Sequence, residues 1–71
     1  MRAIDVKTGN EVRIGDTVKD HDGKPATLVD LVRVNEMYYG GHRSGKVAVR
    51  WPGDKYTMEY YDGVFDLRVE E

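Results

Sequence analysis

The fold is decided by residues 46–60, KVAVRWPGDKYTMEY, in which two alternating segments flank a turn-forming tetrapeptide. Val47, Val49 and Trp51 alternate with polar or small residues, and a period of two is typical of a half-buried strand. The tetrapeptide Pro52-Gly53-Asp54-Lys55 is a strong turn signal. This stretch therefore predicts a β-hairpin.

The second strand of this hairpin is expected over Tyr56–Tyr60, where Tyr56, Met58 and Tyr60 alternate with Thr57 and Glu59. That alternation predicts one shared face for Tyr56 and Tyr60, the same face that carries Trp51.

Turn signals divide the rest of the chain into short β-branched and aromatic runs. Residues 4–6 and 12–14 alternate around a Lys7-Thr8-Gly9-Asn10 link, which predicts a hairpin. Residues 20–25 form a second turn signal, with Gly23 in the left-handed position. Ala26–Val34 is the longest apolar run, and its alternation slips between Leu28 and Val29, which predicts a bulge.

The C-terminal half is predicted to contain one long loop and one short helical turn. Residues 35–45 are rich in glycine and polar residues and are expected to form the longest loop, although Met37, Tyr38 and Tyr39 are unusual there. Residues 61–65 are too interrupted for a strand and fit a single 3₁₀ turn, with Asp62 capping it through nearby amides. Leu67 and Val69 form the last strand. The 71 residues leave room for one all-β domain, spanning residues 1–71, of five or six short antiparallel strands.

Two sets of motifs carry a resemblance to known proteins. Gly15-Asp16-x-Val18, the turn ending in Gly23-x-Pro25-Ala26 and the late 3₁₀ turn resemble an SH3-like small β-barrel. Residues 44–51, with the pattern Ser-Gly-Lys-Val-x-Val-x-Trp, and residues 59–67, with the pattern Glu-Tyr-Tyr-Asp-x-Val-Phe-x-Leu, resemble short proteins encoded by mycobacteriophages. The resemblance implies a small-barrel fold and action in the cytoplasm of a bacterial host, and it implies no catalytic residues.

Composition excludes several classes of protein. The net charge of -2 disfavours a strongly basic nucleic-acid binder, and the absence of cysteine excludes disulfides, thiolate zinc sites and cysteine nucleophiles. The sequence contains no apolar run long enough for a signal peptide or a membrane span. We therefore expect a soluble cytoplasmic protein that binds no cofactor or metal.

Candidate catalytic groups are sparse. Ser44 is the only serine and lies in a glycine-rich segment with His42 too close along the chain to complete a triad. Asp20-His21-Asp22 is better explained as a solvated turn than as a metal site. Asp62 and Asp66 are the remaining carboxylate pair, but we do not expect a chain of this length to supply a substrate cleft as well. We expect no enzymatic activity.

Aromatic residues give the strongest functional indication. Five tyrosines and one tryptophan exceed what so small a core can bury, and exposed Tyr and Trp suit recognition surfaces. We expect a protein-interaction module that binds a bacterial host protein or a second copy of itself. The predicted partner-binding residues are Tyr38, Tyr39, Arg43, Trp51, Tyr56 and Tyr61.

Charge distribution leaves one alternative open. Residues 33–51 carry four basic groups and one acidic group, whereas residues 54–71 carry two basic and six acidic groups. The mixture of aromatic and basic residues in segment 38–51 is compatible with weak nucleic-acid binding, and the acidic C-terminal segment opposes it.

Overall fold

Strands dominate the computed structural model, which describes the backbone of residues 1–39 and 42–70 and the side chains of residues 1–32 and 45–70. This described part of the chain contains seven strands and one 3₁₀ helix. In chain order they are β1 (Arg2–Asp5), β2 (Glu11–Val12), β3 (Thr17–Lys19), β4 (Pro25–Tyr39), β5 (His42–Arg50), β6 (Met58–Tyr61), η1 (Asp62–Phe65) and β7 (Leu67–Glu70).

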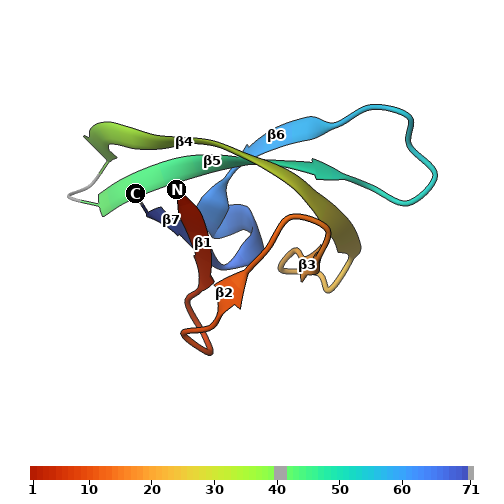
Figure 1. Cartoon of the computed structure of the whole chain (residues 1–71), viewed down its shortest axis with the longest axis horizontal. Coiled ribbons are helices and arrows are strands. Elements are labelled where there is room, and N and C mark those ends of the chain that lie inside the picture. Colours follow the sequence, from red (N-terminus) through yellow and green to blue (C-terminus); the bar gives the residue numbers. More distant parts are fainter. Residues whose placement is uncertain (40–41, 71) are drawn as a thin grey trace.

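The strands form two antiparallel sheets, with orders β2-β1-β7 and β3-β4-β5-β6. Figure 1 shows the long β4–β5 ribbon lying across the small sheet, with η1 between β6 and β7. The structure confirms the predicted all-β class, the antiparallel pairing, the hairpin between β1 and β2, and the 3₁₀ turn before the last strand.

The β4–β5 hairpin differs most from the sequence prediction. Residues 35–45 were expected to form the longest loop, but β4 continues to Tyr39 and β5 begins at His42, with Tyr38 opposite Arg43. Tyrosine is common in strands, and Tyr38 and Tyr39 pair with residues of β5, so glycine content alone was a misleading loop signal. The hairpin therefore has more strand and less loop than the sequence predicted.

Three irregularities bend this ribbon. The register shifts between Leu28 and Asp30, as predicted from the slipped alternation, and again between Leu31 and Arg33 and between Val34 and Tyr38. Each shift places an additional residue or residues on β4 relative to β5, and such bulges increase the local bend and twist of a strand. Figure 1 shows the bent ribbon crossing over the small sheet.

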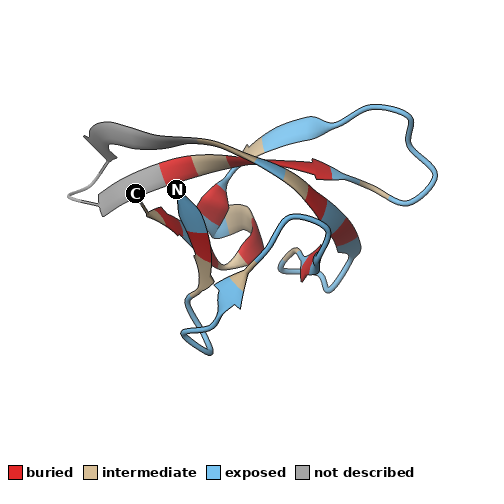
Figure 2. Cartoon of the chain, viewed as in Figure 1, coloured by how far each residue is buried: buried red, intermediate tan, exposed pale blue. Residues whose placement is uncertain are grey.

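The core lies between the ribbon and the small sheet. Leu28, Val47 and Val49 are completely buried. The burial colours of Figure 2 place the buried positions on the inner parts of β4 and β5 and on η1 and β7. The other members of this core cluster are Val18, Ala26, Phe65, Leu67 and Val69.

The predicted strand from Tyr56 to Tyr60 is shorter than expected. The turn after Trp51 is closed by the amide of Asp54, which donates to the carbonyl of Trp51 over 3.1 Å. The chain then remains outside the sheet until Met58, where β6 begins. Tyr56 is 78% exposed and does not share the packed face of Trp51 and Tyr60, so that part of the prediction was wrong.

Asp62 also differs from its predicted role. Its carboxylate does not cap η1; the residue is buried, and Oδ2 accepts the amides of Gly45 and Val69, each over 3.0 Å. The carboxylate therefore joins β5 to β7 instead of satisfying the amides of its own turn.

Candidate functional site

Strand β6 is an edge strand with exposed apolar groups. It pairs with β5 on one side and ends the order β3-β4-β5-β6. Met58 is 47% exposed and Tyr61 is 46% exposed. Tyr56, just before the strand, is the most exposed of these large side chains. Met58 and Tyr61 are three positions apart and therefore lie on opposite faces of the strand. We call Tyr56, Met58 and Tyr61, the exposed side chains along this edge, the β6 surface.

Aromatic packing fixes the inner side of this strand. The Trp51 indole N–H donates to the Tyr60 hydroxyl over 2.9 Å, and the two rings meet edge to face with centroids 6.0 Å apart. Phe65 completes the group, with its ring centroid 5.6 Å from that of Tyr60. Such edge-to-face contacts favour a defined ring arrangement, so β6 is a supported edge.

The predicted binding residues are distributed unequally around this site. Tyr56 and Tyr61 belong to the exposed β6 surface, whereas Trp51 is half-buried against the core. The side chains of Tyr38, Tyr39 and Arg43 lie outside the described residues. Their backbone places Tyr38 opposite Arg43 in the β4–β5 ladder.

Sequence reasoning missed Met58 as a surface residue. Its alternation with Tyr56 and Tyr60 suggested an inward side chain, and it does lie opposite the buried Val49. Exposure of Met58 arises because β6 is the last strand of its sheet, and edge position is a property of the tertiary fold that alternation does not report.

The ring of Tyr61 already holds a cation. The Lys46 ammonium lies 5.4 Å from the centre of that ring, and the two residues are opposite each other in the β5–β6 ladder. A cation at this distance from an aromatic face is attracted by the ring quadrupole. The contact also leaves Lys46 less available to an external anion.

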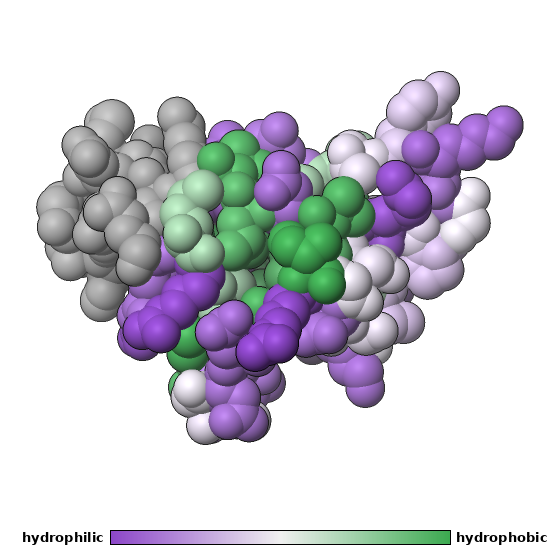
Figure 3. All heavy atoms as spheres, viewed as in Figure 1, coloured by the Kyte–Doolittle hydropathy of each residue, from purple (hydrophilic) through white to green (hydrophobic). Residues whose placement is uncertain are grey.

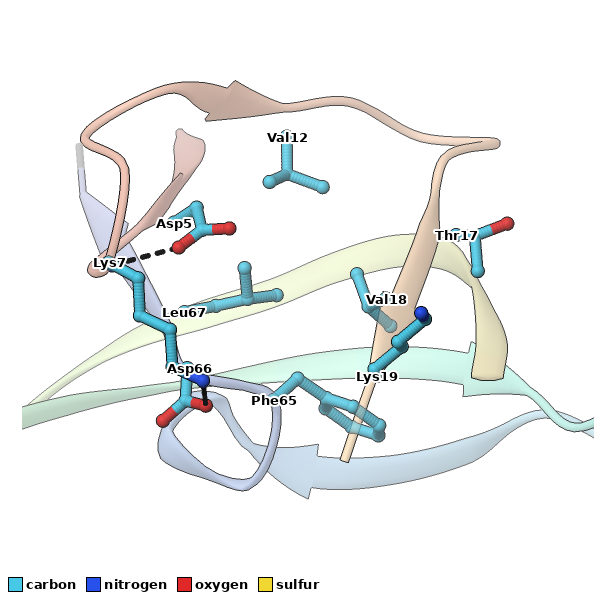
Figure 4. A pocket seen from close by; sticks show the side chains of 9 residues that line it. All are labelled: Asp5, Lys7, Val12, Thr17, Val18, Lys19, Phe65, Asp66 and Leu67. Atoms are coloured by element: carbon cyan, nitrogen blue, oxygen red, sulfur yellow. Dashed lines mark hydrogen bonds and ion pairs between the residues drawn. The ribbon is translucent and has the colours of Figure 1, made fainter. Parts of the chain in front are cut away.

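A second feature is a cavity of about 280 Å³ between the small sheet and β3, shown in Figure 4. Val18, Phe65 and Leu67 contribute apolar wall. At the rim, the Lys7 ammonium lies 3.1 Å from Oδ2 of Asp66. The other charged lining residues are Asp5 and Lys19, so the two acidic and two basic groups balance and give no net preference for an anion or a cation.

Asp66 connects three parts of the chain. Besides the contact with Lys7, its Oδ1 lies 3.2 Å from Nε2 of His21, which belongs to the β3–β4 turn. The hydrogen bond from Lys7, followed by the contact with His21, holds the pKa of Asp66 below its ordinary value of 3.8, although partial burial opposes the shift. The arrangement is a set of charge contacts between turns.

The described side chains do not assemble a catalytic group from the residues considered above. Asp62 is committed to two amides and Asp66 to Lys7 and His21, while the side chain of Ser44 lies outside the described residues. Over the described part of the chain, no group of three His, Cys, Asp or Glu residues is placed to hold a metal ion.

Figure 3 shows one face of the molecule, where apolar groups gather near the centre and hydrophilic groups lie above and below them. None of the helical segments that the structure describes has the length and apolar character needed to cross a bilayer.

Comparison of the chain with protein-family models, with curated proteins and with solved structures gave no match.

Proposed function

We propose that this protein is a non-enzymatic interaction module that binds another protein through the β6 surface. The observation that carries the proposal is the exposure of Tyr56, Met58 and Tyr61 at a supported sheet edge. Exposed apolar groups of this size are typical of contact surfaces. An edge strand also offers backbone donors and acceptors to an added strand.

Charge favours an extended, basic segment of a different protein as the partner. Residues 54–71 carry two basic and six acidic groups, a net charge of -4. Strand β6 itself carries one charged residue, the acidic Glu59. A second copy of the chain would bring the same carboxylate to the interface, and like charges at close range oppose association. A basic segment would be attracted instead.

The wider biological setting is part of the same proposal. The bent β4 strand and the 3₁₀ turn before β7 support membership of the SH3-like class of small barrels. With the resemblance to mycobacteriophage proteins, we propose a phage protein that acts on a host factor in the bacterial cytoplasm.

The proposal is tested by partner capture with a photo-crosslinking residue at position 58 and, as the matched control, at position 14. Ile14 is 55% exposed and precedes β3, away from the β6 surface. We expect a host protein to crosslink from position 58 and not from position 14. Capture of the same host protein without a crosslinking residue should be lost with Tyr56→Ser/Met58→Ser and retained with Ile14→Ser. Equal capture by both variants would contradict the proposal, and capture of a second copy alone would identify a homo-oligomer.

Nucleic-acid binding through residues 38–51 remains the alternative prediction. Arg50 is exposed, but the Lys46 ammonium lies against Tyr61, and Arg43 has no described side chain. Fluorescence anisotropy with labelled single- and double-stranded DNA at two salt concentrations separates the two functions, because phosphate binding weakens steeply with salt.

A further inference from the structure

A shallow groove of about 460 Å³ lies beside the C-terminal end of β6. One side is the β3–β4 turn and the other is the start of η1. The lining residues are Asp20, His21, Asp22, Tyr61, Gly63 and Val64.

The turn side of the groove is acidic and held in a fixed conformation. Oδ1 of Asp20 accepts the amides of Asp22 and Lys24, each over 2.9 Å. Among the ion pairs of the described residues, none involves Asp20 or Asp22. His21 is turned to Asp66. The carboxylate of Asp22 and the second oxygen of Asp20 therefore face a cation from outside.

The opposite side of the groove is apolar and aromatic. Val64 packs against the hydrophobic core and Gly63 leaves its side of the groove open. Tyr61 is half-exposed, and its contact with Lys46 shows that the ring accepts a cation at one face. The groove thus combines negative charge, an electron-rich ring and an apolar wall.

These features suit a side chain with an apolar stem and a cationic end. A guanidinium is favoured over an ammonium because its planar shape can pair with carboxylates and stack on a tyrosine ring. We propose that the groove binds an arginine side chain of the protein segment that docks on β6. This inference rests on the proposed function and assigns the residue that the partner must supply.

The direct test uses two short peptides, acetyl-Gly-Arg-Gly-amide and acetyl-Gly-citrulline-Gly-amide, added to the ¹⁵N-labelled protein. Citrulline has the shape of arginine without its charge. We expect the arginine peptide to shift the amide signals of Asp22, Tyr61, Gly63 and Val64, with the citrulline peptide at least about threefold weaker. Equal shifts with both peptides, or shifts spread over the whole protein, would overturn the proposal.

Charge variants of the protein complete the test. Asp22→Asn should weaken binding of the arginine peptide about two- to fivefold, as expected for an exposed ion pair. Asp54→Asn makes the same charge change in the exposed turn after Trp51 and should leave binding unchanged. Equal weakening by both variants would show a general effect of net charge and contradict a specific site.

Tyr61→Leu separates the contribution of the ring. Leucine keeps an apolar group beside Val64 but removes the aromatic face, so arginine binding should fall about two- to fivefold. Retained binding would remove Tyr61 from the site. The proposed function and the groove can fail separately: crosslinking from position 58 without any arginine preference would support the β6 surface and reject the groove.

Discussion

Asp62 accepts the backbone amide of Gly45, a residue seventeen positions earlier in the chain, over 3.0 Å. The same oxygen accepts the amide of Val69 on β7. One buried carboxylate therefore satisfies two backbone groups on different sheets, β5 in the ribbon and β7 in the small sheet. These two hydrogen bonds help to hold the β4–β5 ribbon over the core and to fix η1 in its position between β6 and β7.

Removal of this carboxylate is predicted to destabilise the protein strongly. Asp62→Ala leaves two amides without their acceptor, and each unsatisfied buried group costs about 1–3 kcal/mol. We expect the free energy of unfolding to fall by about 2–6 kcal/mol, a large part of the roughly 4–10 kcal/mol typical of a domain of this size. Urea denaturation followed by circular dichroism measures the loss.

Asp54→Ala is the matched control, because Asp54 is exposed and contributes its backbone amide to the turn. Its effect should be within about 0.5 kcal/mol. If Asp62→Ala unfolds at the same urea concentration as Asp54→Ala, the bridging role of Asp62 is wrong.

The Trp51–Tyr60 contact is predicted to couple the two residues energetically. Trp51→Phe and Tyr60→Phe each remove the hydrogen bond and keep an aromatic ring. Because each change breaks the same bond, the double variant should be more stable than the sum of the single effects predicts, with a coupling of about 0.5–1.5 kcal/mol. Thermal and urea denaturation of the four proteins measures this term, and additive effects would show that the bond does not contribute.

Local patterns in the sequence predicted the elements whose signal lies within a few residues. Gly23 has φ +80° in the β3–β4 turn, and Gly53 has φ +83° in the turn after Trp51, as the turn signals required. The slip at Leu28 corresponds to a real bulge. The all-β class and the 3₁₀ turn were likewise readable because each is encoded by contiguous residues.

Predictions that needed tertiary information were less successful. Val6 and Ile14 alternate like inward residues but are more than half-exposed, while the small Ala3 is completely buried. The partners of Asp62 and the groove beside Tyr61 come from segments far apart in the chain. Periodicity within one segment reports which residues share a face, and it does not report which face the rest of the protein covers.

Stability is predicted to depend on the ionisation of Asp66 at acidic pH. Lys7 and His21 lower the pKa of this carboxyl in the folded protein below 3.8. A lowered folded-state pKa means that the ionised form stabilises the fold above the unfolded pKa, and that this contribution is lost as pH falls through the folded pKa. The Asp66-dependent part of stability should therefore be complete above about pH 5 and decline below about pH 4.

Asp66→Asn provides the comparison. Asp66 has φ +53°, and asparagine tolerates this left-handed conformation, so the turn is expected to survive. Urea midpoints measured from about pH 2 to pH 6 should fall less steeply on acidification for Asp66→Asn than for the native protein. Lys7→Met should make the decline smaller than in the native protein, because loss of this hydrogen bond brings the folded-state pKa of Asp66 closer to its ordinary value. Identical pH profiles for all three proteins would contradict the assigned role of Asp66.

Tyr38 and Tyr39 provide the last prediction, which concerns the far part of the ribbon. Their positions in β4 place them beside Arg43 and His42 of β5 in the ladder. If these tyrosines belong to the binding surface, Tyr38→Ala/Tyr39→Ala should weaken partner capture at least about tenfold, since an aromatic contact residue commonly contributes more than 1 kcal/mol. The melting temperature should change little, because a surface residue contributes little to folding.

Phe65→Ala is the contrasting control: it removes a side chain that is 4% exposed and should cost about 3–5 kcal/mol of stability. A loss of stability of that size in the double tyrosine variant would place Tyr38 and Tyr39 in the packed structure and remove them from the binding surface, leaving the β6 surface as the site of partner contact.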